Sequence, residues 1–180
     1  MTTRPPLQGV LPVFQTPFHD DDSINYDTLG REIQWLFDQG ADGIVLAMVS
    51  EVLRLSTEER QELAQFACRA GRERGVVVIS VGSESCHTSQ MLARHAEQCG
   101  ADAVMAIPPL TALLGERQTE SYYESILEAS SLPVIVQDAS GYVGRPMSID
   151  LQARLYNRYP ERVLFKPEAH PIGPRLSELH

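Results

Sequence analysis

The sequence predicts an α/β fold in which parallel strands alternate with helices. Short, continuous apolar runs recur about every 30 residues, and a segment with helical spacing of apolar residues follows each run. Runs that are apolar on both faces are typical of strands in a parallel sheet covered by helices. A weak repeat, Gly40-Ala-Asp-Gly-Ile-Val and Gly100-Ala-Asp-Ala-Val-Met, twice places a helix-ending glycine before a strand. Either a doubly wound sheet or part of a (β/α)8 barrel fits this pattern.

The first half of the chain predicts three strands, at 7–14, 43–48 and 76–81. Apolar residues at 29, 33, 36 and 37 predict the first helix over 27–39, because their spacing of three to four residues forms one face. Ser56 and Glu59 form a capping-box pattern, which predicts that the second helix begins there. The third helix is expected to run to Gly100.

The second half predicts three further strands, at 102–107, 133–136 and 162–165. The fourth helix is centred on 122–127, where two tyrosines, an isoleucine and a leucine form an apolar face. Ser148 is expected to cap the fifth helix through its hydroxyl oxygen. A short sixth helix is expected at 175–179.

Composition excludes several classes of protein. The 180 residues carry 24 acidic and 15 basic side chains, a formal net charge of −9, so there is no basic stripe for nucleic acid. No apolar run approaches the roughly 18 residues of a membrane span, and a secretory signal is not expected at the N-terminus. Three cysteines without a C-x-x-C pair indicate a reduced chain. We therefore expect a cytoplasmic protein with one domain over 1–180 and no membrane or nucleic-acid partner.

Polar residues follow the carboxyl ends of the expected strands, where both alternative folds place their active sites. These residues are Thr16, Ser50 with Glu51, Ser80 to Ser83, Gln137 with Asp138, and Lys166. The expected strand interiors are almost wholly apolar. The sequence therefore predicts a functional site on this edge of the sheet.

Lys166 is the only lysine in the sequence, and the other 14 basic residues are arginines. It ends a strand and precedes Pro167, which cannot continue a hydrogen-bonded ladder. Between apolar walls its amine would be poorly hydrated, which favours the neutral form that attacks the carbonyl of a 2-oxo acid. The alternative is a surface lysine that extends along the strand end into solvent. Position alone does not separate the two interpretations.

Other chemistries have no motif in the sequence. There is no dinucleotide or phosphate loop, no serine-hydrolase elbow and no H-E-x-x-H zinc motif. The five histidines show no metal-ligand spacing, so no metal site is expected.

The order of motifs resembles the dihydrodipicolinate synthase/N-acetylneuraminate lyase family, whose members are Schiff-base-forming lyases on a TIM barrel. The motifs are Gly9-Val-Leu-Pro-Val-Phe-Gln-Thr-Pro-Phe18, Gly40-Ala-Asp-Gly-Ile-Val45, Ser50-Glu51, Gly100-Ala-Asp-Ala-Val104, Pro108-Pro109, Leu132-Pro133 and Lys166. The resemblance implies an α/β fold of the (β/α)8 barrel type. It also implies that Lys166 binds the keto carbon and that Ser50 helps to hold the substrate carboxylate, without metal or cofactor.

Departures from the family pattern argue against a dihydrodipicolinate synthase. The Gly-Thr-Thr-Gly-Glu loop of the family is Ala47-Met-Val-Ser-Glu51 here, and the catalytic tyrosine falls on Gln137. The Tyr-Tyr pair after the double proline is Leu110-Thr111. The chain is more similar to the 2-keto-3-deoxy-L-arabonate dehydratase branch, which dehydrates a sugar acid.

The resemblance implies a set of site residues on this branch. Lys166, Gln137 and Glu168 are expected to be catalytic, although a carboxylate such as Glu168 often only orients or neutralises a lysine. Thr16, Ser50, Glu51 and Asp138 are expected to bind the substrate. The substrate is expected to be a small 2-oxo acid, the reaction dehydration or aldol cleavage, and the protein a homo-oligomer.

The length conflicts with a complete barrel. A (β/α)8 barrel takes about 250 residues, and this chain supplies only about six βα units. An open sheet would leave its first and last strands as exposed edges. We expect either a truncated member of the family or a naturally short protein that closes its sheet with another chain. The alternative to an active lyase is an inactive remnant or assembly partner.

Overall fold

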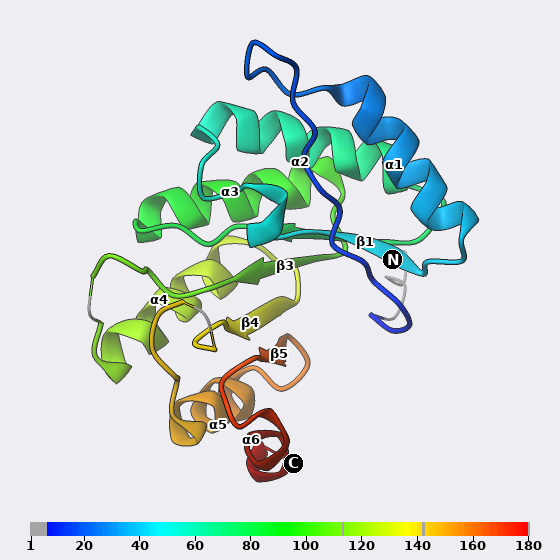
Figure 1. The fold of residues 1–180 in the computed structure, drawn as a ribbon. Helices are drawn as coiled ribbons and strands as arrows, with labels where there is room; N and C mark the ends of the chain where they lie inside the picture. The colour runs from blue at the N-terminus through cyan, green and yellow to red at the C-terminus, as the bar shows by residue number, and fades with distance from the viewer. Residues whose placement is uncertain (1–6, 113, 142, 180) are drawn as a thin grey trace. The chain divides into compact units, whose positions relative to one another are not determined.

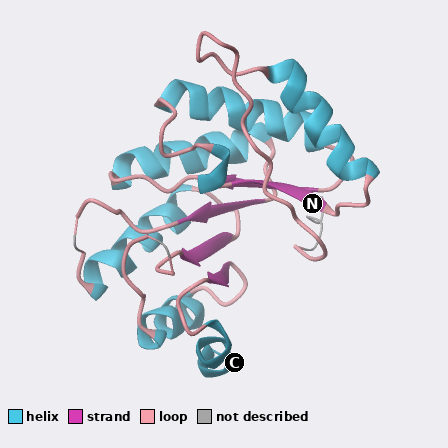
Figure 2. Cartoon of the chain, viewed as in Figure 1, coloured by secondary structure: helices cyan, strands magenta, loops and turns pink. Residues whose placement is uncertain are grey.

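A computed structural model of the chain describes residues 7–112, 114–141 and 143–179. Parallel strands and helices alternate along it (Figure 1, Figure 2). The expected α/β fold of the barrel type is confirmed, with the elements of a partial barrel. The residues group into two compact units. The first consists of residues up to Ser80 with His95–Ala103, and the second of Val81–Arg94 with residues from Val104 onward.

The elements alternate in both units. Up to Ser80 they are α1 (Tyr26–Asp38), β1 (Gly43–Leu46), the 3-10 helix η1 (Met48–Ser50), α2 (Thr57–Gly71) and β2 (Val76–Ser80). The elements that follow are α3 (Cys86–Cys99), β3 (Ala103–Ala106), α4 (Glu116–Ala129), β4 (Val134–Asp138), α5 (Ile149–Arg158), β5 (Val163–Pro167) and α6 (Ile172–Leu179).

In the first unit, β1 and β2 pair in parallel and every residue of both strands is buried. This explains their continuous apolar sequences, since a strand covered on both faces has no polar side. Helices α1 and α2 pack on these strands and on each other. The predicted capping box of α2 is present: the Ser56 hydroxyl accepts from the Glu59 amide at 3.1 Å, and the Glu59 carboxylate accepts from the Ser56 amide at 2.7 Å. Local sequence therefore determines where α2 begins.

The weak repeat has a structural meaning at the amino ends of the strands. The Asp42 amide donates to the Val10 carbonyl at 2.9 Å, and the Val10 amide donates to the Asp42 carboxylate at 2.7 Å. Asp102 makes the same reciprocal pair with Val77, at 2.9 and 2.8 Å. Each aspartate thus ties its own segment to the preceding one. The glycines two residues before them, Gly40 and Gly100, have φ of 92° and 86°, a conformation that glycine adopts without a steric penalty.

The segment 7–14 differs from the prediction of a regular strand. It lies beside β1 and makes strand-like bonds, from the Val45 amide to the Pro12 carbonyl (2.9 Å) and from the Phe14 amide to the Val45 carbonyl (3.3 Å). These bonds leave one isolated bridge, Val13 with Val45. Pro12 has no N–H group, so the preceding bond of the ladder cannot form, and the Phe14 carbonyl accepts from the Ser50 hydroxyl instead of continuing the ladder. The predicted first strand is therefore corrected to an extended segment with a single bridge.

In the second unit, β3, β4 and β5 pair in parallel, and the register places Gln137 opposite Lys166. Tyr122 and Tyr123 of α4 are fully buried, which confirms their expected place in the core. The Ser148 hydroxyl caps α5 by accepting from the Leu151 amide at 3.1 Å. Helix α6 begins at Ile172, three residues earlier than predicted, and buries none of its residues.

Within the described ranges, none of the helices combines the length and the apolar character that crossing a bilayer requires. The same ranges contain no group of three or more His, Cys, Asp or Glu side chains that could hold a metal ion.

Candidate active site

Lys166, Gln137 and Glu168 come together in the second unit, at the carboxyl ends of β4 and β5. The Lys166 Nζ lies 2.5 Å from Glu168 Oε1. The Gln137 Nε2 donates to Glu168 Oε2 at 2.6 Å. Lys166 and Glu168 are two residues apart, which places both on one face of an extended chain, and the parallel register brings Gln137 opposite them. One carboxylate therefore holds the amine and the amide together.

The surroundings of Lys166 are more polar than the sequence suggested. Its side chain is 40% exposed and that of Glu168 is 26% exposed. The ammonium is thus partly hydrated, and its nearest partner is a carboxylate rather than an apolar wall. A carboxylate at 2.5 Å accepts a hydrogen bond from the amine and is close enough to receive a proton from it.

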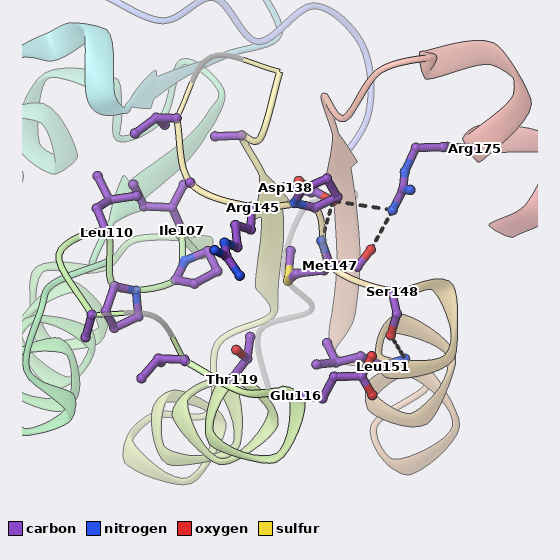
Figure 3. Close-up of a pocket in the computed structure, with 18 residues that line it drawn as sticks. Ile107, Leu110, Glu116, Thr119, Asp138, Arg145, Met147, Ser148, Leu151 and Arg175 are labelled. Atoms are coloured by element: carbon purple, nitrogen blue, oxygen red, sulfur yellow. Dashed lines mark hydrogen bonds and ion pairs between the residues drawn. The ribbon is translucent and has the colours of Figure 1, made fainter.

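Asp138 projects away from this group, as expected for the residue after Gln137 in a strand. It is buried, with 2% of its surface exposed. Its Oδ1 accepts from the Ser140 hydroxyl at 2.5 Å and its Oδ2 from the Met147 amide at 3.0 Å. Its Oδ2 also lies 3.7 Å from Arg175 Nη2, which donates to the Met147 carbonyl at 2.5 Å (Figure 3). These bonds anchor the loop between β4 and α5, and the predicted substrate contact of Asp138 stays a prediction.

Thr16, Ser50 and Glu51 come together in the first unit, near the carboxyl end of β1. The Thr16 hydroxyl donates to the Ser50 carbonyl at 2.7 Å, and the Ser50 hydroxyl donates to the Phe14 carbonyl at 2.6 Å. Ser50 is fully buried, and its oxygen also accepts from the Ala47 amide at 3.2 Å. Both hydroxyls donate their hydrogen bonds to backbone carbonyls, and these bonds fix the loop that contains η1.

Glu51, the third member of this group, has left-handed backbone geometry with φ of 65°. Its carboxylate forms an ion pair with the exposed Arg54. An exposed pair of this kind adds little stability. The predicted roles of Thr16, Ser50 and Glu51 in substrate binding stay predictions.

Sequence reasoning missed Arg175 and Glu84. Arg175 reaches Asp138 across 37 positions of sequence. Glu84 accepts three hydrogen bonds, from the Leu110 amide at 2.7 Å and from the amide and hydroxyl of Thr111 at 3.0 and 2.5 Å. No local pattern marks either residue, because their partners lie far along the chain.

Parallel strands that alternate with helices and carry charged side chains at their carboxyl ends are typical of α/β enzymes, a class that includes the (β/α)8 barrels. Within that class, the chain belongs to the Dihydrodipicolinate synthetase family, which matches residues 6–170. Members of this family are lyases. The family resemblance expected from the sequence is confirmed.

Two relatives act on keto-deoxy sugar acids according to their names. The chain is 30% identical over 168 residues to the probable 2-dehydro-3-deoxy-D-pentonate aldolase YjhH of Escherichia coli (strain K12), covering 93% of this chain and 56% of that protein. It is 28% identical over 182 residues to L-2-keto-3-deoxyarabonate dehydratase of Azospirillum brasilense, covering 99% and 59%.

Synthases are similar to the same degree. The 4-hydroxy-tetrahydrodipicolinate synthase of Bartonella quintana (strain Toulouse) is 28% identical over 173 residues, covering 96% of this chain and 58% of that protein. The crystal structure of dihydrodipicolinate synthase from Aquifex aeolicus superposes with a TM-score of 0.90 at 25% identity, covering 96% and 59%. The chain thus spans less than two thirds of the length of the relatives it matches.

Proposed function

We propose that the chain carries the lysine half-site of a lyase that forms a Schiff base with a 2-oxo acid. The observation that carries this proposal is the group of Lys166, Glu168 and Gln137 at the strand ends, with a carboxylate 2.5 Å from the amine. Family membership supports it, because the relatives are lyases.

The chemistry follows from these three side chains. Glu168 accepts a proton from Lys166, and the neutral amine adds to the keto carbon of the substrate. Glu168 returns this proton to the hydroxyl of the carbinolamine, which leaves as water, and the protonated imine that results acts as the electron sink. Glu168 then takes a proton from C3 to give an enamine and passes it to the C4 hydroxyl, which leaves as water. Gln137 donates a hydrogen bond to the substrate but transfers no proton, since an amide does not titrate in this range.

The substrate that we favour is a 2-keto-3-deoxy sugar acid, which is either dehydrated or cleaved to pyruvate. A dehydratase and an aldolase for such acids are among the relatives, and Gln137 stands where the synthases of the family carry a tyrosine. We propose that the substrate is bound by Thr16, Ser50, Glu51 and Asp138. The protein would act in the cytoplasm as a homo-oligomer.

Borohydride trapping with pyruvate, read by intact mass, tests the proposal. Reduction of the imine leaves a secondary amine, so folded wild type gains one reduced pyruvyl group and Lys166→Ala gains none. Arg162→Gln, a change near the start of the same strand, serves as a control that should still be trapped. The absence of an adduct on folded wild type would refute Schiff-base chemistry in this chain. An adduct on Lys166→Ala would place it on the N-terminal amine.

A second candidate function rests on the free edge of β5. Among the described elements β5 pairs only with β4, so its other edge could pair with a second polypeptide. The chain would then be an inactive assembly partner that keeps the half-site. Wild type that is folded, binds a second polypeptide and gives no adduct would favour this function.

A further inference from the structure

A cavity of about 510 Å³ lies in the second unit, beside the loops that follow β3 and β4 (Figure 3). Its volume is within the range of pockets that bind small molecules. Its apolar walls are formed by Ile107, Pro108, Leu110, Leu114, Met147 and Leu151. A cavity with such walls suits a compact organic ligand rather than a bare ion.

This cavity is separate from the lysine group. Lys166, Gln137 and Glu168 are not among its lining residues, whereas Asp138 is. Successive residues of a strand face opposite sides of the sheet, so Asp138 and Gln137 open onto different spaces. Thr119 of α4 and Leu151 of α5 line the cavity, which places it on the helix-covered side of β4.

Charges around the cavity are largely balanced. Glu116 lies 3.3 Å from Arg154, and hydrogen bonds from Ser148 and Arg154 hold its pKa below the usual value, so this carboxylate stays ionised and satisfied. Asp138 is satisfied by backbone amides and by Arg175. Both acidic groups of the cavity therefore already have partners.

Arg145 is the exception. Figure 3 shows its side chain extending from the loop between β4 and α5 into the cavity, toward Thr119. In the part of the chain that the structure describes, its guanidinium has neither an ion pair nor a side-chain hydrogen bond. The residue is solvent-exposed, so a ligand has access to it. A planar guanidinium offers paired donors that match a carboxylate.

We propose that this cavity is a second ligand site, which binds a small monocarboxylic acid with a short apolar body. Arg145 would hold the carboxylate, and the walls formed by Leu110, Met147 and Leu151 would cover the apolar part. One uncompensated positive charge favours a monoanion, because a dianion would leave one of its charges without a partner.

Calorimetry and backbone-amide NMR on the full chain test this site, with 4-methylpentanoate as the probe. We expect saturable binding with chemical-shift changes at Thr119, Met147 and Leu151. The neutral 4-methylpentanamide should bind at least about tenfold more weakly, the loss expected when a charge-assisted hydrogen bond is removed. Inorganic phosphate should compete poorly.

Arg145→Gln should weaken the acid by a similar factor, whereas Arg117→Gln, an exposed arginine of α4 outside the cavity, should leave affinity unchanged. Equal affinity for acid and amide would overturn the proposal, and so would unchanged binding in a folded Arg145→Gln variant. Shift changes confined to Gln137 and Lys166 would instead assign the acid to the lysine group. If Arg145→Gln does not fold, the comparison of acid with amide on wild type decides.

Discussion

At the residue scale, Glu168 is the side chain whose two oxygens contact both of the other proposed catalytic groups. Oε1 faces the Lys166 amine and Oε2 accepts from the Gln137 amide. A carboxylate so placed would act in two ways, by accepting the lysine proton and by fixing which amide atom of Gln137 faces the substrate.

Glu168→Gln should slow imine formation with pyruvate by about a hundredfold, since positioned proton transfer contributes on this order. The measurement is the rate of borohydride trapping with pyruvate. Glu161→Gln, an exposed carboxylate of the same unit, is the control. Equal rates in wild type and Glu168→Gln would show that Glu168 takes no part in proton transfer.

Glu84 supports a second prediction at this scale. Burial alone would raise the pKa of this carboxyl group, but hydrogen bonds from Thr111 and Leu110 outweigh it and hold the pKa below the usual 4.5. A pKa lowered by folding stabilises the protein above the unfolded pKa, and this contribution disappears as pH falls through the lowered value.

The melting temperature of Glu84→Gln should therefore lie below that of wild type near neutral pH. The gap should close as pH falls below 4.5 and through the lowered pKa of Glu84, because the wild-type carboxylate becomes protonated there. Paired thermal melts across this range check the prediction. A gap that stays constant with pH would show that hydrogen-bond geometry matters and the charge does not.

At the element scale, α2 depends on its cap. Ser56→Ala removes the hydroxyl that accepts from the Glu59 amide, and should cost about 1 kcal/mol of unfolding free energy. Urea unfolding provides the measurement. Ser121→Ala, at an exposed position within α4, is the matched control and should change stability little. Equal effects of the two changes would mean that the cap does not limit the stability of α2.

The elements show how far sequence reasoning reaches. The strands after the first, the α2 capping box and the Ser148 cap depend on neighbouring residues, and the sequence predicted them. Lys166 and Glu168 were also found, because they are two residues apart at a strand end. The long-range bonds from Ser50 to Phe14 and from Arg175 to Asp138 were not predicted, since they arise only when distant segments meet. Pro12 is a local signal in the sequence that indicates an interrupted first strand, because proline cannot donate to a strand ladder.

At the scale of the whole molecule, the three cysteines report on folding. Cys86 is exposed, Cys99 is partly exposed and Cys68 is buried. Burial raises the pKa of the Cys68 thiol to about 12, so at neutral pH almost no thiolate forms there. Cys68 should therefore react only when the protein unfolds.

A thiol titration with Ellman's reagent checks this expectation. Native protein should show one fast thiol, which disappears in Cys86→Ala, and full labelling should require denaturant. Fast native labelling of Cys68, seen by peptide mass analysis, would contradict the burial that the structure assigns to it. The labelling rate of Cys68 would also follow the global opening of the chain, because a buried thiol reacts through unfolded states.

The reciprocal bonds of Asp42 and Asp102 fix the register of the segments that they join. A shift of one residue would break both bonds of a pair and would also turn every side chain to the opposite face. Thr16 lies six residues beyond Val10, so the position of its hydroxyl in the first unit depends on the bonds of Asp42 at the other end of the segment. Loss of Asp42 should thus alter substrate binding without removing any group that touches substrate.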